Sequence, residues 1–323
     1  MKRYTLRLLT LVLVVVVIAS LCVGAANVSL SDLLDSLLHP TAVTVTHGII
    51  WDVRLPRIAA ALVCGASLAM AGAVLQATFA NPIVDSALIG ISGSAACGAA
   101  LGLLVAPLSQ ATPTSIAGAL VGAALAVFIL VRTRQVGLRF TLFGIALGSA
   151  ASALLALVGS DTHRANGRSL VSWLFGSLAL TTWSSVATVT ISLVLGALML
   201  LGQGQLLDVG SFGAASAAHL GLDLKRQRLR WLIAVTMLVA PSVALFGAIG
   251  FVGLAVPHIA RMLGAVNHRV LLPVSALIGA GVVTLADTTS RTIAGPMEIP
   301  LSITLALVGA PILFMVLRGM RDE

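Results

Sequence analysis

The stretch RLPRIAAALVCGASLAMAGAVLQATFANP at residues 54–82 decides the fold of this chain. Two arginines and a proline lead into a long run of apolar and small residues, which closes on an asparagine and a proline. A second stretch, GFVGLAVPHIAR at residues 250–261, predicts a short helix that Pro257 and His258 open. A charged approach to an apolar helix, with a short helix elsewhere, favours a channel-forming membrane protein over a simple anchor.

Composition places the whole chain in the same class. Apolar residues make up 59% of the sequence and charged residues 9%, and the mean hydropathy is +1.08. A soluble domain carries roughly 25% charged residues. Backbone polar groups must be satisfied internally in lipid, which leaves the α-helix as the structure of these apolar segments. The sequence therefore predicts an all-α membrane protein with one integral domain over residues 1–323.

Apolar segments long enough to cross a bilayer recur along the chain, since a span needs about 20 such residues. The eighth predicted span is short, and a count of about ten depends on it. The most charged connection, residues 206–230, follows the sixth span, and its small residues predict a low-profile helical pair against which another protein could pack. The ten predicted spans are 6–26, 57–79, 86–106, 113–132, 139–159, 183–202, 231–248, 250–263, 271–289 and 300–317.

Basic residues predict the orientation. With ten spans and both termini in the cytoplasm, 14 of the 19 Lys and Arg fall on the cytoplasmic side, as the positive-inside rule requires. Without the eighth span this bias weakens. The net charge of +8 is explained by these loops, and the sequence gives no reason to expect nucleic-acid binding. A helix lying on the outer face is predicted within residues 160–182, with Trp173 and Trp183 at the membrane interface.

Small residues recur within the spans at a spacing of four. Gly144 with Gly148, and Gly65 with Ala69, are two such pairs. This spacing lets helix backbones approach closely in lipid. Close packing of the bundle is the simpler interpretation, and a path for cargo between the helices is the alternative.

Several motifs together resemble the FecCD family of permeases of ABC importers for iron–siderophores, haem and cobalamin. They are RLPR at 54–57, GASLAMAGAVLQ at 65–76, NPIVDSALIG at 81–90, GFVGLAVPHIAR at 250–261, HRVLLPVSALIGA at 268–280, LADTTSR at 285–291 and MEIPLSI at 297–303. The resemblance implies the ABC importer type II permease fold, with about ten transmembrane helices. It also implies a second permease subunit, identical or paralogous, two ABC ATPase subunits, an extracytoplasmic substrate-binding protein and the cytoplasmic membrane of a prokaryote.

The resemblance implies roles for individual residues. Those expected to dock the binding protein are Arg54, Arg57 and Arg291; those of the ATPase coupling loop are Gly213, Ala217, Leu220 and Gly221; those of the translocation path and helix packing are Gly65, Gly72, Gln76, Asn81, Pro82, Gly144 and Gly148; and those of the short helix are Pro257, His258 and Arg261. Local pairing is the alternative for two of the arginines, because Arg291 stands four residues after Asp287 and Arg54 stands near Asp52.

The sequence predicts a permease without catalytic groups, metal or cofactor. Its only lysines are Lys2 and Lys225, and neither follows the glycines of a P-loop, so ATP hydrolysis must come from partner subunits. Asp287 near the outer end and Asp85 near the inner end, where we expect it to cap a helix or face water, are too few for an evident proton relay. A secondary transporter is the weaker alternative. Ferric siderophore is the first expectation for the cargo, with haem and then cobalamin as alternatives.

Overall fold

The computed structural model describes residues 3–24, 28–39, 44–105, 110–132, 138–159, 175–220, 223–293 and 298–319. Within these ranges the chain is helical and contains no β-strand. Each of the ten predicted spans overlaps one helix, so the all-α prediction is confirmed. These helices are α1 (Arg3–Cys22), α4 (Leu55–Thr78), α5 (Ile91–Val105), α6 (Ala111–Arg132), α7 (Leu138–Gly159), α9 (Trp183–Leu200), α12 (Leu224–Phe246), α13 (Val252–Met262), α14 (His268–Ile293) and α15 (Leu301–Gly319).

Among the described residues, six segments are long and apolar enough to cross a membrane by length and composition alone. They are Tyr4–Cys22, Val45–Thr78, Ala111–Arg132, Trp183–Leu200, Arg226–Phe246 and His268–Ile293. Shorter apolar helices lie at Ile91–Val105, Leu142–Leu157 and Leu301–Pro311. The chain is therefore built to pass through the bilayer several times.

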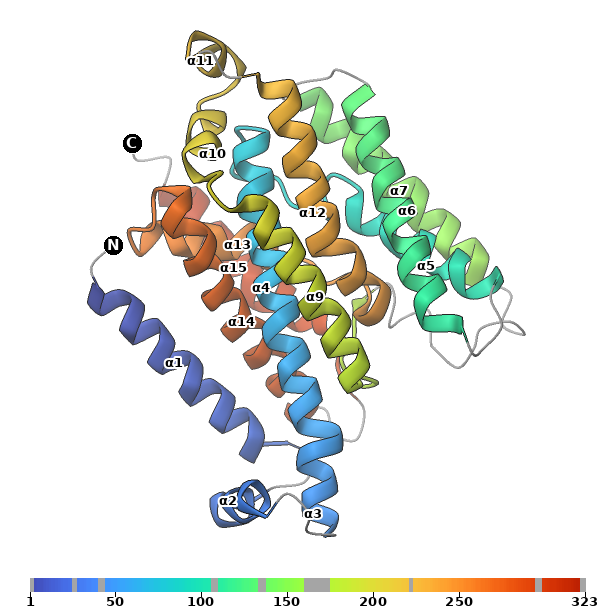
Figure 1. The fold of residues 1–323 in the computed structure, drawn as a ribbon, viewed down its shortest axis with the longest axis vertical. Helices are drawn as coiled ribbons and strands as arrows, with labels where there is room; N and C mark the ends of the chain where they lie inside the picture. Colours follow the sequence, from blue (N-terminus) through green and yellow to red (C-terminus); the bar gives the residue numbers. More distant parts are fainter. Residues whose placement is uncertain are drawn as a thin grey trace.

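Short helices mark the two ends of the bundle (Figure 1). At one end lie α10 (Gly204–Ser211) and α11 (Ala214–His219), and at the opposite end lie α2 (Leu30–Leu38) and α3 (Val45–Gly48). A π-helical segment, Ile49–Arg54, joins α3 to α4. Pro56 follows it directly; because a proline has no N–H and its ring clashes with the carbonyl four residues back, a wider turn accommodates it better than a regular α-helix.

Helix α4 runs through the middle of the bundle, with α9, α12, α13 and α14 around it (Figure 1). Every residue from Cys64 to Thr78 is buried, as expected of a helix that is apolar on all sides. Glycines permit the closest approaches. A Cβ on Gly65 would lie 2.2 Å from the carbonyl oxygen of Gly279 in α14, and one on Gly72 would lie 2.0 Å from that of Gly253 in α13.

A second group of helices, α5, α6 and α7, packs in the same way. A Cβ on Gly98 of α5 would lie 2.1 Å from the carbonyl oxygen of Gly118 in α6. In α7, a Cβ on Gly144 would lie 2.6 Å from the Cα of Ile89, and one on Gly148 would lie 3.2 Å from the Cα of Gly90. The predicted small-residue pairs therefore lie at close contacts within this chain, either with another helix or with the turns before α5. A role in a translocation path stays a prediction.

Several helix boundaries differ from the predicted ranges; α12, for example, begins at Leu224 and not near residue 231. Two differences concern the quoted motifs. Helix α5 begins at Ile91 and not near residue 86, because residues 80–90 form turns in which Ala80 and Gly90 have positive φ. Helix α13 begins at Val252, so the prediction that Pro257 and His258 open it is wrong. Pro257 lies inside the helix, and Phe251, with φ of 69°, marks its start.

Asp85 also lies differently from the prediction. It is 5% exposed, and its Oδ1 accepts hydrogen bonds from the backbone N–H and the hydroxyl of Ser86, at 2.5 and 3.2 Å. Gly253 leaves the space that this carboxylate fills, since a Cβ there would lie 2.4 Å from Oδ1. Asp85 therefore neither caps α5 nor faces water. It is a buried acid whose partners are local.

Candidate docking and coupling sites

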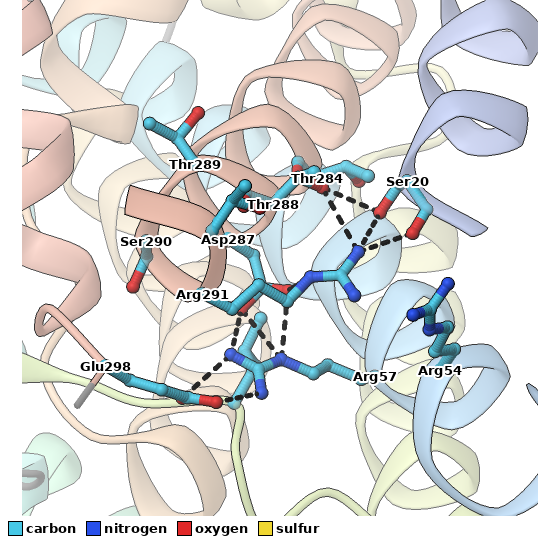
Figure 2. A network of polar contacts seen from close by, with 12 residues as sticks. Ser20, Arg54, Arg57, Thr284, Asp287, Thr288, Thr289, Ser290, Arg291 and Glu298 are labelled. Atoms are coloured by element: carbon cyan, nitrogen blue, oxygen red, sulfur yellow. Dashed lines mark hydrogen bonds and ion pairs between the residues drawn. The ribbon is translucent and has the colours of Figure 1, made fainter. Parts of the chain in front are cut away.

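Arg57, in the first turn of α4, lies between two carboxylates (Figure 2). Its Nε and Nη2 donate to Asp287 of α14 at 3.0 and 2.8 Å, and its Nη1 and Nη2 donate to Glu298 at 2.7 and 2.9 Å. Arg57 is 6% and Asp287 2% exposed, whereas the Glu298 side chain is 36% exposed. The five N–H donors of one planar guanidinium allow it to hold both acids. This contact ties α4 to α14 and to the segment before α15.

Arg291 and Arg54 extend this network toward α1. Arg291 Nη2 donates to the hydroxyl of Ser20 at 2.8 Å and to its carbonyl oxygen, and Arg291 Nε lies 3.7 Å from Asp287 Oδ2. Arg54 Nη1 donates to the carbonyl oxygen of Leu21. The two arginines thus donate to carbonyl oxygens in the last turn of α1, where such groups lack a donor within the helix.

Gly24 has no side chain, and this leaves room for the guanidinium groups of Arg54 and Arg291 beside it. A Cβ on Gly24 would lie 2.8 Å from Arg291 Nη1 and 3.1 Å from Arg54 Nη2. We call Arg54, Arg57, Asp287, Arg291 and Glu298 the arginine cluster. Its three arginines and two acids give it a formal charge of +1. Arginine engages carboxylates bidentately, so the cluster has the chemistry to accept a further carboxylate.

The structure brings together the three arginines that the resemblance assigned to docking, in surroundings that the sequence did not predict. Arg54, Arg57 and Arg291 are 4%, 6% and 8% exposed, and their side chains cross-link helices of this chain. The local alternative for Arg291 is also found, since it approaches Asp287. Glu298 was missed, because nothing in the sequence shows that the segment after α14 returns to α4. The docking role stays a prediction.

Gln76 joins α4 to α13. Its Nε2 donates to the carbonyl oxygens of Gly253 and Leu254 at 3.2 and 3.3 Å, and its Oε1 accepts from Arg261 Nη1 at 2.7 Å. Pro257 explains this arrangement, because it has no N–H to donate to the carbonyl of Gly253 four residues back. Gln76 supplies the missing donor, so the two predicted motifs meet at one junction.

Asn81 and Pro82 form the turn that follows α4. The side-chain oxygen of Asn81 accepts a hydrogen bond from the backbone N–H of Ile83 at 3.0 Å. The backbone N–H of Asn81 donates to the carbonyl oxygen of Gln76. These bonds are those of an asparagine turn. A direct role of either residue in cargo passage stays a prediction.

The predicted helical pair in residues 206–230 is present as α10 and α11. Gly213 separates the two helices with φ of 91°, a conformation that glycine adopts without strain. Ala217 is buried, whereas Phe212 and Leu220 are 74% and 68% exposed at the end of the bundle. Gly221 lies outside the described residues. The pair thus presents apolar side chains next to a glycine turn.

Two other predictions have limited outcomes. The outer helix was expected within residues 160–182. Trp173 and residues 160–174 lie outside the described residues, and residues 176–182 are not helical. Trp183 begins α9 and donates to the carbonyl oxygen of Trp51 at 3.2 Å. Among the described residues, no group of three or more His, Cys, Asp and Glu could hold a metal ion.

Comparison with known proteins identifies the family. The model of the FecCD transport family matches residues 12–319. The chain belongs to the FecCD transport family. It is 37% identical to the vitamin B12 import system permease protein BtuC of Vibrio cholerae, over 85% of this chain and 84% of that protein. It is also 37% identical to the uncharacterized ABC transporter permease protein YvrB of Bacillus subtilis, over 83% of this chain and 78% of that protein.

A solved structure supports the same conclusion. It is described as an inward-facing conformation of a putative metal-chelate type ABC transporter, and it matches with a TM-score of 0.83 at 32% identity, over 98% of this chain and 100% of that one. This FecCD protein therefore has the type II importer permease fold. It is a multi-pass transport permease subunit and not a catalytic one. Permeases of this kind work with ATPase subunits and a binding protein.

Proposed function

We propose that this FecCD protein forms the membrane path of an ATP-driven importer that moves a metal chelate across the cytoplasmic membrane of a prokaryote by alternating access. The family match over residues 12–319 carries the proposal. Both termini lie in the cytoplasm in this proposal, consistent with the distribution of basic residues. The complete importer contains a second permease subunit, identical or paralogous, two ABC ATPase subunits and a binding protein.

The α10–α11 pair is the proposed contact with the ATPase. Phe212 and Leu220 expose apolar side chains just before and just after α11, and an ATPase subunit docked there would cover them. The loop is also at the end of the bundle that the basic residues assign to the cytoplasm.

The arginine cluster is the proposed contact with the binding protein. It lies at the opposite end of the bundle from α10 and α11, and its formal charge of +1 favours an acidic partner. Because the three arginines are buried, the partner's carboxylate would have to reach them past Glu298, the most exposed residue of the cluster. A docked carboxylate would complete the charge balance of the cluster.

The identity of the cargo is the most specific part of the proposal. Family frequency alone favours a ferric siderophore. The relatives named as vitamin B12 import permeases, at 34% to 37% identity, favour cobalamin. We therefore propose cobalamin as the first candidate and ferric siderophore as the second, with haem as a further candidate.

Uptake by cells tests this proposal. Cells that lack the gene, and the same cells with the gene restored, are given radiolabelled cyanocobalamin, a ferric hydroxamate siderophore or haem. We expect cobalamin uptake to fall to background in the deletion strain and to return on restoration, with glucose uptake as the control for general membrane damage. Loss of siderophore uptake alone would move the cargo assignment to iron. Unchanged uptake of all three would contradict the proposal.

A further inference from the structure

A hydrogen-bonded contact between a carboxylate and an imidazole joins the α10–α11 pair to α14. Asp208, in α10, accepts two hydrogen bonds on the same oxygen, Oδ1: one from the backbone N–H of His268 at 2.8 Å and one from its ring Nδ1 at 2.5 Å. The side chain of His268 is 4% exposed and that of Asp208 30% exposed. A carboxylate accepts but does not donate, so His268 Nδ1 carries the proton.

His268 is the first residue of α14, and its N–H has no acceptor within that helix. The carboxylate of Asp208 therefore caps α14 from another helix. A negative charge at this position also interacts favourably with the positive end of the helix. The contact is directional, because it fixes both the backbone and the side chain of one residue.

Helix α10 also packs closely against α14 at Gly204. A Cβ on Gly204 would lie 2.5 Å from the Cγ of Arg269 and 2.9 Å from its backbone nitrogen. On the other side of α10, a Cβ on Gly210 would lie 3.0 Å from the ring of Trp231, which is fully buried in α12. With such close packing on both sides, α10 cannot move alone: a shift of α10 has to displace α14 or break the bond to His268.

Helix α14 extends from this contact to the arginine cluster. Its 26 residues would measure about 39 Å at the rise of an α-helix. It packs along α4 through Gly279, and its last turns carry Asp287 and Arg291. One continuous helix, which contains Pro273, therefore joins the proposed ATPase contact at one end of the bundle to the proposed docking site at the other.

We propose that Asp208 and His268 form the joint through which movement of the α10–α11 pair reaches α14. The inference rests on the proposed function, since it assigns the ATPase to α10 and α11. Asp208 and His268 are positioning residues, which touch neither cargo nor nucleotide. Without their bond, ATP hydrolysis continues, but α14 no longer follows it.

The test follows the far end of α14 in the complete importer with its ATPase subunits and binding protein. Cys22, Cys64 and Cys97 are replaced by alanine, and a nitroxide is attached at Thr289→Cys, an exposed position in the last turns of α14. Its spectrum is recorded with and without ATP and vanadate. We expect an ATP-dependent change in the parent complex. We expect His268→Leu to abolish this change while ATP hydrolysis remains, and to lower transport of cyanocobalamin per ATP roughly fivefold or more.

Conservative variants separate a joint from a merely structural bond. His268→Asn keeps a side-chain donor near Asp208 and should restore the spectral change. Asp223→Asn is the matched control on the same connection, because Asp223 is exposed and its carboxylate lies 3.9 Å from Arg226 of its own segment. It should leave the signal as in the parent. Thermal unfolding of each complex is measured alongside.

Three results would overturn the inference: no ATP-dependent change in the parent complex, the same change in His268→Leu as in the parent, or a loss in His268→Leu that His268→Asn does not restore. Failure of the proposed function looks different. In that case the parent complex would neither hydrolyse ATP nor move any of the three cargoes.

Discussion

Asp287→Ala is expected to destabilise the protein by about 3–5 kcal/mol, the usual cost of leaving one partner of a buried ion pair without the other. Asp287 is 2% exposed and bonds both Nε and Nη2 of Arg57. Without it, Arg57 retains, among the described residues, its bonds to Glu298, and Arg291 loses its contact with the Asp287 carboxylate. The measurement is thermal or denaturant unfolding of the purified protein in detergent.

Two further variants make this prediction specific. Glu298→Gln should cost less, because the Glu298 side chain is 36% exposed and Arg57 keeps Asp287. The double variant Arg57→Met with Asp287→Leu should recover much of the stability lost by Asp287→Ala, since an apolar pair leaves no uncompensated charge. Equal losses from Asp287→Ala and Glu298→Gln would contradict this account of the cluster.

Gly72→Ala is expected to prevent normal packing of α4 against α13. The new Cβ would lie 2.0 Å from the carbonyl oxygen of Gly253 and 2.4 Å from its Cα, so two backbones would have to separate. Overpacking of a well-packed core costs typically 1–3 kcal/mol, and a clash between backbones belongs at or above that range. We expect little folded protein in the membrane, measured by fluorescence-detected size exclusion.

Gly281→Ala is the matched control for Gly72→Ala. Gly281 also lies in a helix, but the nearest atom to its Cβ position is a side-chain carbon of Leu13 at 3.6 Å. The alanine should fit and should stabilise α14 slightly, because glycine is less favourable in helices than alanine by about 1 kcal/mol. If the two variants behaved alike, the close contact between Gly72 and Gly253 would not be the cause.

The sequence predicted the helices well because lipid leaves few alternatives. Long apolar runs must be helical in a bilayer, and each of the ten predicted ranges overlaps a described helix. The prediction for Pro257 failed because a proline is favoured at a helix start. Nothing in the local sequence shows that Gln76 of α4 donates to the carbonyl oxygen of Gly253, which Pro257 cannot bond. The burial of Asp85 depends on the absence of a side chain at Gly253, which again is a tertiary fact.

The candidate sites were predictable in their residue types and not in their contacts. Arg54, Arg57 and Arg291 were expected to share a docking role, yet their contacts involve Glu298 and the end of α1, which lie far from them in sequence. The α10–α11 pair followed from small residues in a charged loop. Its bond to α14 did not, because Asp208 and His268 stand 60 residues apart and only the fold brings them together.

The most direct test of the central claim uses the complete importer in proteoliposomes, with the binding protein and radiolabelled cyanocobalamin on the side of the arginine cluster. We expect uptake only when ATP is supplied to the ATPase subunits, and none with a proton gradient in the absence of ATP. Uptake that a proton gradient drives without ATP would show a secondary transporter and would contradict the account.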